Sequence, residues 1–77
     1  MANRPLFVIA NEIKADWVKP YFGAIPYLDA MSTLTDIKDS YYADSADTIV
    51  LYLLSNMTTY RGETARRIKL ELKGLIK

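Results

Sequence analysis

The hydrophobic and polar positions divide the chain into one continuous apolar run and three segments with helical spacing. The run is IVLYLL at residues 49–54. Residues suited to cap a helix or to lie in its first turn precede it, namely Asp44, Ser45 and Asp47. Six consecutive apolar side chains point in every direction around a helix, so we expect protein to cover the run on most sides. We predict a helix over residues 45–58, and a charge at Leu51 is expected to unfold the domain. A buried strand is the alternative, because periodicity does not assign so short a run.

Residues 4–18 carry an apolar stripe with the spacing of a helix. The apolar residues recur at intervals of three and four, as Leu6, Ile9, Ile13 and Trp17. Asn3 is a candidate N-cap, and Pro5 lies in the first turn, where its missing N–H costs nothing. We expect this helix to end before Pro20, since the residue that precedes a proline is biased away from the helical conformation.

A second, shorter helix is predicted over residues 26–34. Pro26 suits its first position, and Asp29 places a carboxylate in the first turn. The apolar residues of this segment have helical spacing and are Tyr27, Leu28, Met31 and Leu34. Thr33 and Thr35 weaken the pattern, so we expect about ten residues of helix.

The last predicted helix covers residues 61–76. Its apolar residues share one face, which we expect to pack on the helix at 45–58, and they are Ala65, Ile68, Leu72, Leu75 and Ile76. We expect Arg67 to pair with Glu63 and with Glu71, each four residues away, on the exposed side of the helix.

The connection over residues 35–47 is rich in aspartate. Its four aspartates are Asp36, Asp39, Asp44 and Asp47. Their spacing lacks the pattern of a calcium-binding loop, so we assign them to turns and helix caps and predict no metal site. We expect Ile37 and one of Tyr41 or Tyr42 to contact the core, and a short helical turn is compatible with this stretch.

Residues 17–27 hold four of the nine aromatic residues and two of the three prolines. Such a stretch is too apolar for a loop that only contacts solvent. One interpretation is a lid over the core, since small domains use aromatic side chains to enlarge the buried area. The other is an exposed aromatic anchor for a partner, formed by Tyr21 and Phe22.

Composition limits the size and the chemistry of the protein. The 77 residues make one domain, 1–77, and the three glycines and three prolines favour helices over an all-β fold. Cys and His are absent, which excludes disulfides, thiolate zinc sites and every Ser-His or Cys-His nucleophile pair. We therefore predict a non-enzymatic protein without a cofactor. No apolar run approaches the length needed to span a membrane or to form a secretory signal, which favours a cytoplasmic location.

Positive charge gathers at the C-terminal end. Residues 1–60 carry four basic and seven acidic side chains, net −3, whereas residues 61–77 carry six basic and two acidic, net +4. A stripe of basic residues flanks the apolar face of the last helix, made of Arg66, Lys69, Lys73 and Lys77. Leu70 lies within this stripe, so we expect its side chain to be exposed. The stripe is typical of a solvated helix face, of a surface that binds an acidic protein, or of a phosphate-binding surface.

The segments YRGETARRIKLELK (60–73) and YFGAIPYLDAM (21–31), with Trp17, resemble a group of short phage- and prophage-encoded proteins without an assigned function. The resemblance covers most of residues 12–73; the relatives tend to have Trp in place of Tyr60 and a Gly close to Tyr42. It implies a phage origin and a stand-alone small domain, and it supplies no catalytic residue. By analogy, small phage proteins of this kind often bind a host macromolecule, for example as inhibitors of a host polymerase, nuclease or defence system.

We predict an all-α fold, a small bundle of about four helices around a central apolar helix. The predicted function is that of a non-enzymatic phage accessory protein that binds a host or phage protein in the cytoplasm. The predicted partner-binding residues are Tyr21, Phe22, Arg66, Lys69, Leu70 and Lys73. The alternative is a nucleic-acid-binding module that uses Arg61, Arg66, Arg67, Lys69 and Lys73. No membrane partner is expected, and a symmetric homodimer stays open, because it would bury an exposed apolar strip.

Overall fold

Over the residues that the structure describes, the fold is a bundle of four α-helices, which confirms the predicted all-α class. The computed structural model describes residues 4–38, 40–41 and 44–76, with only the backbone for residues 40, 41 and 44. Its elements are α1 (Leu6–Asp16), the 3-10 helix η1 (Phe22–Ala24), α2 (Ile25–Met31), β1 (Ser40–Tyr41), β2 (Asp44–Ser45), α3 (Ala46–Ser55) and α4 (Glu63–Leu75). The two short strands pair antiparallel.

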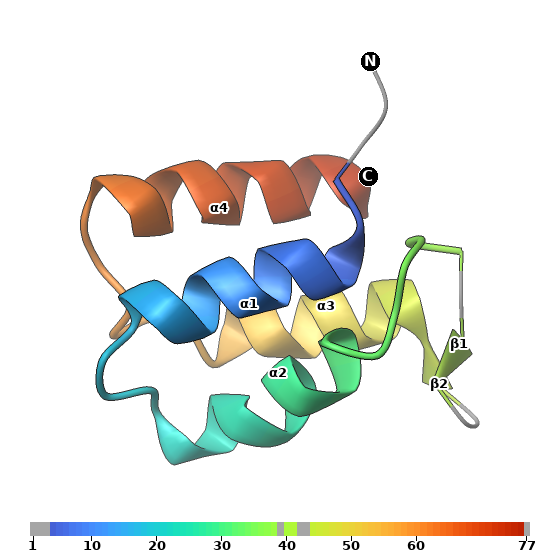
Figure 1. The fold of residues 1–77 in the computed structure, drawn as a ribbon, viewed down its shortest axis with the longest axis horizontal. Coiled ribbons are helices and arrows are strands. Elements are labelled where there is room, and N and C mark those ends of the chain that lie inside the picture. The colour runs from blue at the N-terminus through green and yellow to red at the C-terminus, as the bar shows by residue number, and fades with distance from the viewer. Residues whose placement is uncertain (1–3, 39, 42–43, 77) are drawn as a thin grey trace.

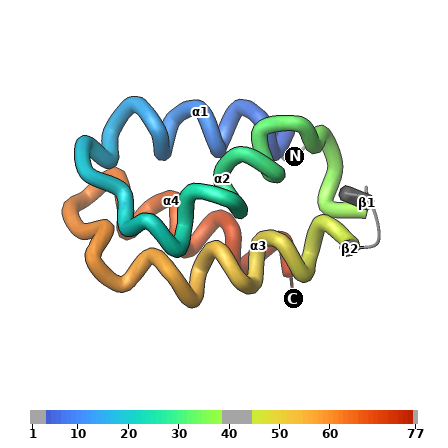
Figure 2. Tube along the Cα trace, turned by 90° about the horizontal axis from the view of Figure 1, so that it is seen from below, coloured from blue at the N-terminus to red at the C-terminus, as the bar shows by residue number. Residues whose placement is uncertain are grey.

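The helices pack in a ring. α1 contacts α2, α2 contacts α3, α3 contacts α4, and α4 returns to α1. Figure 1 shows α4 at the top of the bundle and α2 at the bottom, and Figure 2 shows α1 and α3 on opposite sides. Each helix therefore has an inner face toward one shared core and an outer face toward solvent.

All four helices contribute to this core. The largest fully buried side chains are Tyr60, Leu6, Ile9, Ile13, Leu28, Met31, Leu53, Met57, Ile68, Leu72 and Val50. No polar or charged side chain is buried among the residues that the structure describes. Burial of apolar surface is therefore the dominant stabilising contribution of the bundle.

α1 begins at Leu6, two residues later than predicted, with Pro5 as its N-cap. The amide groups of Leu6 and Phe7 donate to the carbonyls of Thr35 and Leu34, each at 2.9 Å. Backbone that follows α2 thus satisfies the first-turn donors that a capping side chain usually satisfies. The predicted cap, Asn3, lies outside the described residues.

α2 ends at Met31, earlier than the predicted residue 34. The hydroxyls of Ser32 and Thr33 donate to the carbonyls of Asp29 and Ala30, at 2.6 and 2.7 Å. Hydroxyl groups that donate to backbone carbonyls in this way compete with the backbone hydrogen bonds of a helix, so they favour a turn over continued helix.

α3 begins at Ala46, one residue later than predicted, with Ser45 as its N-cap, and it ends at Ser55 rather than at residue 58. Its apolar run is not covered on most sides: the exposed fractions of Leu51 and Tyr52 are 51% and 48%. The prediction was wrong for these two residues, because the elements that contact α3, among them α2 and α4, leave its outer face open to solvent. A charge at Leu51 is consequently not expected to unfold the domain.

The connection between α2 and α3 contains the β1–β2 pair instead of a helical turn. Ser40 pairs with Ser45, and Tyr41 pairs with Asp44. Ile37 packs against the core as predicted. The side chain of Tyr41 and all of Tyr42 and Asp39 lie outside the described part of the chain.

The aromatic segment 17–27 divides between core and surface. Trp17 is buried and stacks on Tyr60, with ring centroids 5.0 Å apart, so this end acts as a lid. Tyr21 and Phe22 are exposed to 45% and 76% and contact each other at 4.9 Å between ring centroids. Gly23 allows this turn, since a Cβ there would lie 2.7 Å from the Tyr21 ring.

Candidate partner-binding groove

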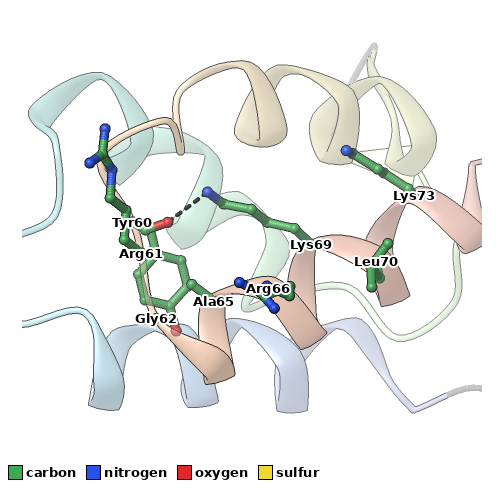
Figure 3. A pocket seen from close by; sticks show the side chains of 8 residues that line it. All are labelled: Tyr60, Arg61, Gly62, Ala65, Arg66, Lys69, Leu70 and Lys73. Carbon is green, nitrogen blue, oxygen red and sulfur yellow. Dashed lines mark hydrogen bonds between the residues drawn. The ribbon is translucent and has the colours of Figure 1, made fainter.

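An open groove of about 540 Å³ runs along α4 (Figure 3). The lining residues come from α4 and from the turn that precedes it, and they are Tyr60, Arg61, Gly62, Ala65, Arg66, Lys69, Leu70 and Lys73. Four of the eight carry a positive charge. We call this site the basic groove.

The chain reaches the basic groove through a glycine. Gly62 has φ +117°, a backbone conformation that side chains with a Cβ rarely adopt, and it is the N-cap of α4. From there the helical repeat places Arg66, Lys69 and Lys73 on one flank of the helix, beside the buried face of Ala65. The turn and the repeat together line up the cations.

Lys69 is partly engaged within the fold. Its Nζ donates a hydrogen bond of 2.6 Å to the backbone carbonyl of Tyr60, as Figure 3 shows. Burial lowers the pKa of Lys69, and the nearby charges of Arg61 and Lys73 lower it further. Lys69 therefore fixes the turn to α4 in addition to adding positive charge to the groove.

Tyr60 forms the buried end of the groove. Its ring stacks on Trp17, and its hydroxyl donates to the Asp16 carboxylate at 2.8 Å. Burial and the carboxylate of Asp16 raise the pKa of the Tyr60 phenol. The groove thus ends on a side chain that the core and α1 hold in place.

Leu70 has an exposed fraction of 64%, which confirms that its side chain faces solvent. It lies on the groove lining between two cations, Arg66 and Lys73, each about one helical turn away from it. An apolar side chain at this place offers contact area that a purely ionic surface lacks.

The other flank of α4 has paired charges. Arg67 donates to Glu12 of α1, and Arg4 donates to Glu71 through two hydrogen bonds of 2.9 and 2.6 Å. Nη1 of Arg4 also lies 2.9 Å from Oε1 of Glu12. Hydrogen bonds from Arg4 and Arg67 lower the pKa of the Glu12 carboxyl, and burial opposes this shift. We call this set of four residues the paired flank.

The paired flank corrects the expected pairs within the last helix. Arg67 was expected to pair with Glu63 and with Glu71 on an exposed face. Arg67 and Glu71 instead bond to residues of α1 and of the segment before it, because the ring of helices brings α1 against this side of α4.

The predicted site residues fall in three places. The basic groove brings together Arg61, Arg66, Lys69, Leu70 and Lys73, whereas Arg67 faces α1. Tyr21 and Phe22 do not line the groove; η1 lies at the lower edge of the bundle in Figure 1, with α4 at the top. Lys77 lies outside the described residues.

Three groove residues were missing from the sequence-based site, Tyr60, Gly62 and Ala65, of which Ala65 was predicted only as part of the apolar face. A glycine directly before a helix is a signal for Gly62, because glycine is one of the residues found at N-caps. No local pattern identifies Tyr60, whose place depends on its stacking partner 43 positions earlier, Trp17.

Two other features, a metal-holding group of side chains and a membrane-spanning helix, are not found in the part of the chain that the structure describes. No group of three or more Asp or Glu side chains is placed to hold a metal ion there. None of the described helices has the length and apolar character needed to cross a membrane. The chain matches no family model, no curated protein and no solved structure.

Proposed function

We propose that this chain is a non-enzymatic accessory protein of phage origin that binds a host or phage protein through the basic groove. The observation that supports this most strongly is Leu70, an exposed leucine within a groove lined by four cations. Apolar anchors surrounded by charged residues are typical of protein-binding surfaces.

The internal contacts favour a protein partner over nucleic acid. Of the five residues predicted to contact phosphates, Arg67 pairs with Glu12 and Lys69 donates to the Tyr60 carbonyl. Leu70 gains nothing from a phosphate backbone, whereas it gains buried area against a protein.

The proposed origin and the proposed absence of catalysis rest on the sequence. One of the two stretches that resemble the phage proteins, residues 60–73, is also the stretch that builds the basic groove. The lack of His and Cys removes the commonest nucleophile and base pairs.

The test is affinity capture from bacterial lysate, with and without nuclease, using the tagged wild-type chain, Leu70→Ala and Leu51→Ala. Leu51 is the matched control, since it is also an exposed leucine in the middle of a helix. We expect one protein to be retained after nuclease treatment by the wild type and by Leu51→Ala, and to be lost with Leu70→Ala.

Two results would contradict the proposal. Recovery of nucleic acid, with loss of all proteins after nuclease treatment, would establish the alternative of a nucleic-acid-binding module. In that case affinity should fall steeply with salt, with the slope reduced by about one for each of Arg61, Arg66 and Lys73 removed. Equal capture by Leu70→Ala and Leu51→Ala would move the binding surface away from the groove.

A further inference from the structure

We infer that the partner segment that occupies the basic groove is an acidic amphipathic helix. This inference rests on the proposed function and specifies its partner. Three properties of the groove support it: the backbone that lines it, the spacing of its charges and its length.

The backbone along the groove has few free hydrogen-bonding groups. From Glu63 to Leu75 the lining is helical, so most of its amide and carbonyl groups bond within α4, and the Tyr60 carbonyl already accepts from Lys69. An extended segment would leave its own backbone groups unpaired wherever it covered Ala65 and Leu70. A helix satisfies its backbone internally and presents only side chains.

The charges have the repeat of a helix. Arg66, Lys69 and Lys73 follow one another at intervals of three and four residues along α4. A second helix alongside α4 repeats with the same rise, so carboxylates three and four residues apart would meet these cations in register. An apolar residue between the carboxylates would contact Leu70, which gives the partner helix its amphipathic pattern.

The length of the groove suits a helix of about three turns. The part of the lining within α4 extends from Ala65 to Lys73, which corresponds to roughly 12 Å of helical rise, and the turn residues Tyr60, Arg61 and Gly62 lengthen the groove beyond it. A second copy of this chain is a poorer occupant, because Glu12 and Glu71, two of its helical carboxylates, are already paired with Arg4 and Arg67.

The test is a titration of the full ¹⁵N-labelled chain with each of three synthetic peptides of about 14 residues. Binding is monitored through the NMR chemical shifts of the backbone amides. The first is an acidic helix of Glu, Ala and Leu, with glutamates three and four residues apart. The second has proline in its middle, and the third has Lys in place of every Glu. We expect the acidic helix to bind and to shift the amides of Ala65 and Leu70. We also expect an affinity at least about tenfold lower for the proline peptide and no saturation by the lysine peptide.

Two variants locate the binding. Leu70→Ala should weaken the acidic helix by about fivefold or more, and Leu51→Ala should leave its affinity unchanged. The inference would be overturned by equal affinity of the proline peptide, by shifts confined to residues outside the groove, or by no saturation at millimolar peptide. Because lysate capture does not depend on the form of the bound segment, Leu70-dependent capture together with such a result would overturn the inference and leave the proposed function standing.

Discussion

The two flanks of α4 both carry charged residues but differ in how those charges are paired. On the paired flank, Arg67 and Glu71 are bonded to Glu12 and Arg4. On the other flank, Arg66 and Lys73 have no ion pair with any described residue, and Leu70 between them is exposed. The charge pattern of one helix thus separates into a part that holds the bundle together and a part that stays available to the proposed partner.

The largest expected effect on the free energy of unfolding comes from the buried face of α4, not from either flank. Ile68→Asp places an unpaired carboxylate in the core and should cost about 3 kcal/mol or more, enough to unfold a small domain. Leu70→Asp should stay within about 0.5 kcal/mol of the wild type. Circular dichroism and thermal denaturation of both variants check this; a folded Ile68→Asp would contradict the assigned core.

The next largest effect is the difference in free energy of unfolding between variants on the two flanks of α4. Glu71→Ala removes both hydrogen bonds from Arg4 and should lower the free energy of unfolding by about 1 kcal/mol. Lys73→Ala on the groove side should change it by less than about 0.5 kcal/mol. Urea denaturation of the two variants measures the difference, and equal effects would show that the paired flank does not stabilise the bundle.

A smaller effect is expected at Lys69, the cation that the fold itself uses. Lys69→Met keeps most of the apolar stem but loses the hydrogen bond to the Tyr60 carbonyl, at a cost of about 0.5–1 kcal/mol. Amide exchange in the turn that contains Arg61 should become faster than in Arg66→Met, which serves as the exposed control. Unchanged exchange would mean that Lys69 does not fix the turn.

The smallest effect is the pH dependence of stability from Glu12. The pKa of Glu12 is lowered from its ordinary value of 4.5 in the folded state. Its contribution is therefore fully present above pH 4.5 and is lost as the pH falls through the lower, folded-state value. Denaturation of the wild type should show this loss below pH 4.5, and Glu12→Gln should show a shallower decrease. An identical pH profile for the two proteins would contradict the pairing of Glu12.

The local features of the sequence were sufficient to predict much of the fold. Proline positions, capping residues and apolar spacing indicated all four helices to within a few residues at each end. The exposure of Leu70 also followed from its place on the helical repeat, since a single helix determines it.

The contacts between helices were beyond the reach of local patterns. Arg67 pairs with a residue 55 positions away, Glu12, although two glutamates lie within one turn of it. The open face of α3 at Leu51 likewise depends on how many helices surround it, and hydrophobicity alone does not reveal this number. The turn at Tyr60 depends on its contacts with Trp17 and Lys69.

The measurement that tests the central claim most directly is photo-crosslinking from a single introduced cysteine. Because the chain has no native cysteine, Leu70→Cys and Leu51→Cys each give one site for a thiol-linked photo-crosslinker. In nuclease-treated bacterial lysate we predict one protein adduct from position 70 and none from position 51. An adduct from position 51 alone, or equal adducts from both positions, would contradict the claim that the basic groove is the partner-binding surface.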